Sequence, residues 1–213
     1  MLATSILGLL ALSTTTSASP IKRAGTITAE DLISIAPNTT DCDNAPAAGE
    51  CRTAAQAAGY IAISFTNFGI TSFAEQAALV ADMLYESGDF RYAINHYPGI
   101  LGQGTRMMMS PEYVGKYAEY LSTVCANCGI SSGDVAAAEA EGPAKLLELV
   151  NTDEWGFGAA AWFLVTQCGD SVRQELAAGT QAGFEAFLSE CIGTSVTDNR
   201  VAVWNAAMAI RSW

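Results

Sequence analysis

Apolar residues recur at helical spacing along most of the chain, whereas the alternation typical of strands is nearly absent. The clearest case is the segment 72–87, where two neighbouring stripes are apolar. One stripe carries Phe73, Ala77, Val80 and Leu84, and the other carries Leu79 and Met83. Little of such a helix can face water, so we expect it to be buried at the centre of a mainly α domain.

Capping and helix-breaking residues indicate where the other helices begin and end. Gly69 ends a first helix over 53–68, and Ser72 with Glu75 forms a capping-box pattern at the start of the second. Pro111 suits the first position of another helix. Further helices are expected over 143–150, 154–167, 171–178, 181–191 and 199–212. Neither an internal repeat nor a linker is visible, which favours one domain.

One long stretch, from Gly88 to Met109, breaks this helical pattern. It is rich in glycine, aromatic and hydrogen-bonding residues, and it contains His96, which is the single histidine of the chain. Irregular segments of this length inside compact domains are often functional. We therefore expect this loop to line a functional cleft.

The first residues predict processing and export. A short apolar run followed by small residues reads as a signal peptide over 1–18, and the dibasic pair Lys22-Arg23 ends a short propeptide over 19–23. A single domain would then occupy 24–213. The rest of the chain has no apolar run of membrane-spanning length, so we expect a secreted, extracellular protein with Asn38 available for glycosylation.

The charge balance is strongly acidic. The sequence has 10 Lys and Arg against 22 Asp and Glu, for a formal charge of −12, and removal of Lys22 and Arg23 leaves 8 against 22. This field repels nucleic acid and anionic membranes. We expect neither as a partner, and we expect a monomer.

Six cysteines in an exported chain predict three disulfides. Fifteen pairings are possible, and local pairing is favoured. The expected bridges are Cys42–Cys51, Cys125–Cys128 and Cys168–Cys191. The C-x-x-C formed by Cys125 and Cys128 could instead indicate zinc or redox chemistry. A single histidine and no second C-x-x-C argue against that alternative, so we expect neither a metal nor a cofactor.

Glu86 lies in the last turn of the 72–87 helix, on the side of Leu79 and Met83. The carbonyl end of a helix and apolar neighbours both disfavour a carboxylate anion. The side chain is therefore expected to hold a proton, as a general acid must. The alternative is a structural carboxylate that faces solvent or pairs with Arg91 or Arg106.

The string Glu86-Ser87, followed by an irregular segment and Gly102-Gln103-Gly104, resembles the Glu-Ser…Gly-x-x-Gln pattern of the lysozyme and lytic transglycosylase superfamily. More broadly, the stretches 58–108, 153–168, 191–194 and 197–198 look like secreted fungal proteins that include muramidases. The resemblance implies a lysozyme-like helical fold, with Glu86 as the catalytic acid and the following loop as the sugar cleft. Met107 departs from the asparagine found at that position of the group.

The candidate site then includes several residues near Glu86. Asp89 is the candidate second carboxylate, although it could equally pair with Arg91 or cap the turn. The candidate substrate-binding residues are Tyr85, Tyr92, Asn95, His96, Gln103, Thr105, Arg106 and Trp155. Aromatic residues can stack on sugar rings, but they are at least as often part of a core.

Taken together, these features predict a secreted glycoside hydrolase that cleaves β-1,4 bonds between N-acetylated amino sugars, with peptidoglycan as the expected polysaccharide substrate. Two alternatives stay open. One is a chitinase or chitosanase of the same superfamily, because an acidic surface suits cationic chitosan. The other is a secreted binding protein or effector that keeps the fold without activity.

Overall fold

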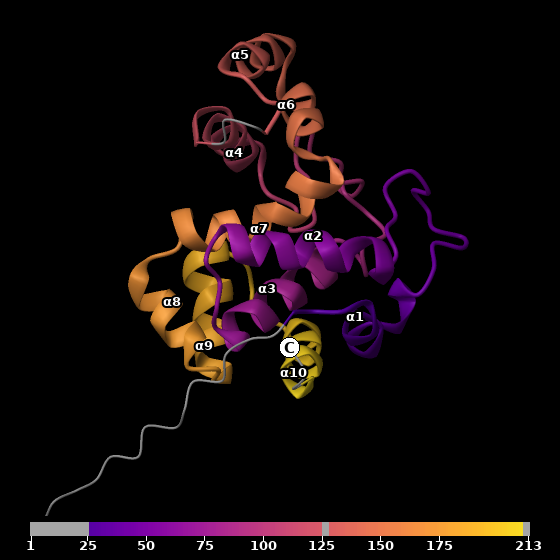
Figure 1. Ribbon diagram of the computed structural model, residues 1–213, viewed down its shortest axis with the longest axis vertical. Coiled ribbons are helices and arrows are strands. Elements are labelled where there is room, and N and C mark those ends of the chain that lie inside the picture. The colour runs from indigo at the N-terminus through magenta and orange to yellow at the C-terminus, as the bar shows by residue number, and fades with distance from the viewer. Residues whose placement is uncertain (1–25, 125–127, 211–213) are drawn as a thin grey trace, which may run out of the picture.

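The computed structural model describes residues 26–124 and 128–210, which form ten α-helices and no strand. Figure 1 shows their arrangement. The helices are α1 (Ala29–Ile35), α2 (Ala54–Asn67), α3 (Phe73–Glu86), α4 (Pro111–Val124), α5 (Ser132–Glu141), α6 (Pro143–Val150), α7 (Asp153–Gln167), α8 (Asp170–Ala177), α9 (Gln181–Ala186) and α10 (Asp198–Ala209). A 3₁₀ turn, η1 (Pro37–Thr39), and a π-helical turn, η2 (Phe187–Ile192), complete the fold.

Helix α3 lies at the centre of the molecule, as its two apolar stripes predict. Every residue from Ala74 to Leu84 is buried, and α3 packs against α7, α8 and most extensively against α10. Ser72 caps the helix by accepting a hydrogen bond from the Glu75 N–H. Burial on all sides explains why even the polar residues of α3 need partners inside the protein.

The remaining helices form two groups on either side of α2 and α7, which pack against each other. Figure 1 shows α4, α5 and α6 at one end, and α1, α8, α9 and α10 at the other. Helix α7 is apolar around most of its circumference and is buried from Gly156 to Leu164, as expected for a helix covered on several faces. None of the helices in the described part of the chain is long and apolar enough to cross a membrane.

The mainly α prediction is confirmed, and most predicted helices agree with the observed ones within one or two residues. Three differences are informative. Glu75 does not complete a capping box, because its carboxylate pairs with Arg173 at 3.0 Å. The predicted helix over 181–191 becomes π-helical after Ala186. Helices α1 and α5 were not predicted, although Thr28 and Ser131 begin both with complete capping boxes.

Two of the three predicted disulfides are confirmed. Cys42 joins Cys51 across the loop before α2, and Cys168 joins Cys191 between the end of α7 and η2. The predicted Cys125–Cys128 bridge lies outside the described residues, because 125–127 are not described. The predicted signal peptide over 1–18 and propeptide over 19–23 lie outside them as well.

Candidate functional site

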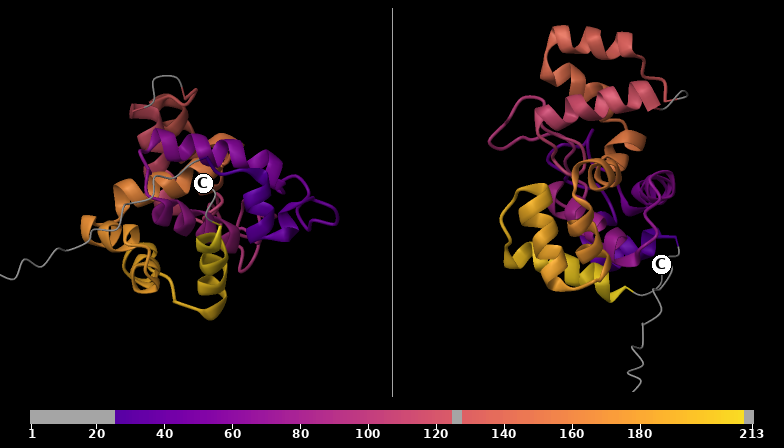
Figure 2. Two further views of the ribbon diagram at one scale, coloured as in Figure 1. Left: turned by 60° about the horizontal axis from the view of Figure 1, so that its bottom comes forward. Right: turned by 90° about the vertical axis from the view of Figure 1, so that its left-hand side faces the viewer.

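The loop between α3 and α4 is irregular, as predicted, and it is held by specific contacts. In the right-hand view of Figure 2 this segment projects from the body of the molecule beside the beginning of α4. Glu50 anchors it from outside: one carboxylate oxygen accepts the N–H groups of Ala93 and Ile94, at 2.8 and 3.0 Å, and the other lies 2.7 Å from His96 Nε2. The Cys42–Cys51 bridge fixes the residue beside Glu50.

Arg106 supports the loop from inside. It is 3% exposed, and its guanidinium donates to the carbonyls of Phe90, Tyr92 and Glu50 at 3.1, 3.0 and 2.8 Å. Burial and the neighbouring Arg52 lower its pKa to about 10. Arg106 therefore stays charged at neutral pH and ties three backbone segments together.

Asn95 and Gln103 hold the loop to itself. The Asn95 amide donates to the Gln103 side-chain oxygen at 2.8 Å, and the Asn95 oxygen accepts the N–H groups of Gly99 and Ile100. The Gln103 amide donates to the Met108 carbonyl at 2.9 Å. Both side chains face the site, but most of their hydrogen-bonding capacity is already used within the loop.

Glu86 ends α3 next to Arg200 of α10. Arg200 Nη2 donates to Glu86 Oε1 at 2.5 Å, and its guanidinium lies 4.2 Å from the centre of the Tyr85 ring. The cation offsets the adverse position of a carboxylate at a helix carbonyl end. Glu86 is thus ion-paired, as the structural alternative expected, but its partner is Arg200 rather than Arg91 or Arg106.

Asp82 lies one turn before Glu86 and also faces Arg200. Its side chain is buried, with Oδ1 3.8 Å from Arg200 Nη1. Neither Asp82 oxygen has a hydrogen-bond partner among the described residues. Burial and the nearby Glu86 carboxylate raise the pKa of Asp82 well above its usual range, against the opposing effect of Arg200. One arginine thus faces two carboxylates, Asp82 and Glu86.

A pocket of about 320 Å³ opens beside Glu86. Its other lining residues all come from the loop: Tyr92, Ile94, Asn95, His96, Tyr97, Gln103 and Met108. We call it the Glu86 pocket. Glu86 Oε2 and the hydroxyls of Tyr92 and Tyr97 receive no hydrogen bond from the described residues, so these groups are available to a ligand. Tyr97 is 93% exposed at the rim.

The structure brings together five of the predicted site residues: Glu86, Tyr92, Asn95, His96 and Gln103 all line the pocket. The other five, which do not line it, are Tyr85, Asp89, Thr105, Arg106 and Trp155.

Each of these five has a position that explains its absence from the pocket. Tyr85 packs on Arg200, and Asp89 accepts a hydrogen bond from Asn38 at 2.9 Å. Thr105 and Arg106 belong to the loop, but their side chains are buried. Trp155 lies near the start of α7, where its carbonyl accepts the Tyr117 hydroxyl.

Sequence reasoning missed Arg200, Asp82 and Glu50. Arg200 follows Glu86 by more than a hundred residues, and only the packing of α10 on α3 brings the two together. One sequence signal was available. The chain has few cationic residues, and an arginine in a helix with apolar residues needs an acidic partner when it is buried. Asp82 gave a similar signal, because it is a carboxylate inside a helix that the pattern predicted to be buried.

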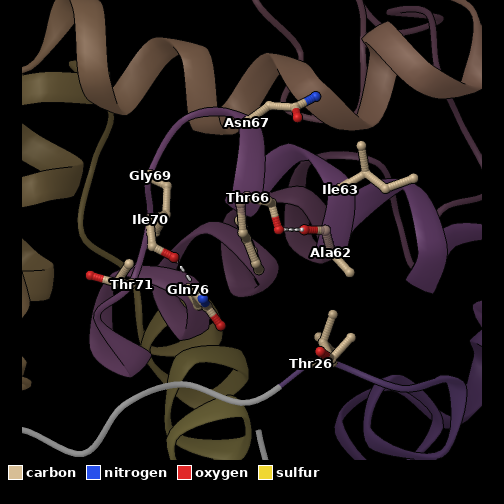
Figure 3. A pocket seen from close by; sticks show the side chains of 11 residues that line it. Thr26, Ala62, Ile63, Thr66, Asn67, Gly69, Ile70, Thr71 and Gln76 are labelled. Carbon is tan, nitrogen blue, oxygen red and sulfur yellow. Dashed lines mark hydrogen bonds between the residues drawn. The ribbon is translucent and has the colours of Figure 1, made fainter.

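A second, larger pocket of about 500 Å³ lies at the other end of α3. Its lining, which has no charged residue, comes from α2, the turn between α2 and α3, the start of α3 and the segment before α1 (Figure 3). Gln76 donates to the Ile70 carbonyl at 2.7 Å, and its side-chain oxygen is buried without a partner in the described part of the chain. We call this the Gln76 pocket.

Comparison with known proteins finds no matching family and no matching solved structure. A curated relative is 42% identical over 142 residues, which make up 66% of this chain and 11% of the relative. That relative is named a bifunctional dioxygenase (DOX)-epoxy alcohol synthase (EAS), from Fusarium oxysporum (strain Fo5176). The chain therefore spans about a ninth of the curated relative that it matches.

This relative corrects the functional interpretation of the sequence. The predicted membership of the lysozyme-like muramidases is wrong, since the similarity is to a protein named for dioxygenase and epoxy alcohol synthase activities. The prediction of an O-glycosyl hydrolase that degrades cell walls is wrong for the same reason. Neither the Glu-Ser…Gly-Gln-Gly string nor the broader stretches was sufficient evidence, because a buried acidic helix end followed by a glycine-rich loop also arises for structural reasons.

Proposed function

We propose that this chain is a binding domain for a small oxygenated molecule, with an epoxy alcohol as the ligand class. The observation that carries the proposal is the Glu86 pocket, where an ion-paired carboxylate leaves one oxygen available and two tyrosines, Tyr92 and Tyr97, belong to the lining. The relative's name supplies the ligand class. Because the chain spans a small part of that relative, its two activities are not assigned to this chain.

The hydrogen-bonding groups of the pocket suit this ligand. An alcohol O–H can donate to Glu86 Oε2, and an epoxide oxygen, which can only accept, can take a hydrogen bond from the hydroxyl of Tyr92 or Tyr97. Ile94 and Met108 give the same pocket an apolar wall. Arg200 holds the carboxylate in place from behind, so that little ordering is needed when the ligand binds.

Binding of 2,3-epoxyhexan-1-ol to the purified protein, measured by isothermal titration calorimetry, tests the proposal. We expect Glu86→Gln to weaken binding about tenfold, because a hydrogen bond to a charged acceptor is stronger than one to a neutral amide by about 1–1.5 kcal/mol. Glu139→Gln is the matched control, since Glu139 is exposed on α5. Absence of binding, or equal binding by the Glu86→Gln variant, would refute the proposal.

The polysaccharide partner predicted from the sequence stays a prediction. Tyr97, exposed at the pocket rim, could stack on a sugar ring. Titration with chitin oligosaccharides and with soluble peptidoglycan fragments under the same conditions separates the two ligand classes. Stronger binding of either sugar than of the epoxy alcohol would favour the polysaccharide.

We also propose that the chain is exported; the monomer expected from the sequence stays a prediction. The support is the apolar N-terminal run, the dibasic pair Lys22-Arg23 and the two disulfides. Expression in a fungal host followed by N-terminal sequencing of the medium tests export. A secreted form that begins at Ala24 is expected, and protein retained inside the cell would contradict it.

A further inference from the structure

We infer that the ligand of this chain is amphipathic, with its oxygenated end in the Glu86 pocket and an aliphatic tail in a neighbouring pocket. This inference rests on the proposed function and specifies its ligand further. It starts from a third pocket, of about 270 Å³, which shares Ile94 and Asn95 with the Glu86 pocket. The two pockets are therefore neighbours, and Ile94 and Asn95 line both of them.

The third pocket is apolar where the Glu86 pocket is polar. Its apolar lining comes from Ile94, Ile100 and Leu101 of the loop and from Ala144 and Leu147 of α6. We call it the Ile100 pocket. A pocket with this lining favours a hydrocarbon group over a polar one.

The polar residues of the Ile100 pocket already have partners. The Glu148 carboxylate pairs with Lys145 at 2.8 Å, and the Asn151 amide donates to the Ala93 carbonyl at 3.1 Å. The Asn95 oxygen accepts two loop N–H groups, from Gly99 and Ile100. These side chains therefore add little demand for a polar ligand group.

The pocket also explains an unusual concentration of exposed apolar side chains. Of the eight large hydrophobic side chains that are exposed in the described part of the chain, four lie within 94–101: Ile94, Tyr97, Ile100 and Leu101. Leu101 is 66% exposed. No acidic residue occurs between Asp89 and Glu112, although the chain as a whole is strongly acidic. An exposed apolar patch of this kind indicates a binding surface.

The loop is held firmly enough to form a lasting pocket. A Cβ at Gly102 would lie 2.6 Å from Pro143 Cβ, and one at Gly104 would lie 2.5 Å from the Ala93 carbonyl oxygen. The loop backbone therefore lies directly against the start of α6 at Gly102 and against the Ala93 carbonyl of the same loop at Gly104. A ligand tail that covers Ile100 and Leu101 would bury apolar surface without requiring the loop to refold.

A series of epoxy alcohols of increasing chain length tests the inference. The probes are 2,3-epoxybutan-1-ol, 2,3-epoxyhexan-1-ol and 2,3-epoxyoctan-1-ol, which share one polar end. In the unmodified protein each added methylene that becomes buried should strengthen binding by up to about fourfold. The eight-carbon probe should therefore bind at least about tenfold more tightly than the four-carbon probe.

Variants assign this gain to a pocket. Leu101→Ser should remove most of the gain with chain length and leave the four-carbon probe unaffected. Val196→Ser, which changes an exposed residue outside all of these pockets, is the matched control. Ala62→Phe fills the Gln76 pocket, whose lining includes Ala62. This variant should change neither the affinity for the probes nor the gain in affinity with chain length.

The outcomes are distinguishable from those of the proposed function. Binding that depends on Glu86 but not on chain length would overturn the tail site and leave the proposed function standing. Loss of the chain-length gain in Ala62→Phe, with Leu101→Ser unchanged, would place the tail in the Gln76 pocket and also overturn the inference. No binding of any probe would refute the proposed function itself.

Discussion

Arg106→Met should destabilise the protein by about 2–4 kcal/mol, because it removes a buried donor that serves several backbone carbonyls. Methionine keeps an unbranched apolar side chain that can still contact Phe157, whose ring centre lies 4.8 Å from the Arg106 guanidinium, but it donates no hydrogen bond. The carbonyls of Tyr92 and Glu50 lose the donor that Arg106 supplies, and a buried group left unsatisfied costs about 1–3 kcal/mol. The Phe90 carbonyl keeps one donor, the Arg52 N–H at 3.0 Å, whereas the partly buried carbonyls of Tyr92 and Glu50 must regain water.

Urea unfolding followed by circular dichroism measures this loss. Arg91→Met is the control, because Arg91 lies in the same loop and its side chain makes no ion pair or hydrogen bond to any described residue. Its effect should stay within about 0.5 kcal/mol. The Arg106 variant should also lose affinity for the epoxy alcohol, because Tyr92 and Ile94 would no longer be held in place. A loss of stability below about 1 kcal/mol would show that Arg106 does not support the loop.

Three further predictions concern stability. Because burial raises the Asp82 pKa, the folded state holds this proton to higher pH than the unfolded state does. The free energy of unfolding therefore falls as pH rises from about 4 through the raised pKa. In melting experiments from pH 4 to pH 8, Asp82→Asn should abolish that part of the decline. Replacing Cys168 and Cys191 with serine should cost about 3 kcal/mol in chemical denaturation, and a loss below about 1 kcal/mol would contradict the constraint. Gly104→Ala should cost more than about 2 kcal/mol, because its Cβ would overlap a carbonyl oxygen and Leu147, and a neutral effect would refute this packing.

The fold could be predicted largely from local signals. The buried stripes of 72–87, the glycine at position 69 and Pro111 all marked helices that the structure contains. Short helices were harder: α1 has seven residues, too few for a periodic pattern, and only its capping box indicates it. The π-helical turn after Ala186 gave no sequence signal that we can identify.

The candidate site was predicted in part. The loop and Glu86 were recognised because a long irregular segment follows a buried helix. The roles inside the loop were not, because the sequence does not show that Arg106 points inward to three carbonyls or that Glu50 lies beside His96. Contacts between residues far apart in the chain decide these roles, and Arg200 with Glu86 is the longest example. The predicted function was wrong because it depended on a sequence resemblance, and the sequence does not show these contacts.

The most direct test of the central claim is a crystal structure of the protein with 2,3-epoxyoctan-1-ol. The account predicts that the ligand hydroxyl lies about 2.5–3.0 Å from Glu86 Oε2, with the aliphatic tail passing Ile94 to contact Ile100 and Leu101. A ligand bound in the Gln76 pocket, or one bound with its tail toward Glu86, would contradict the account.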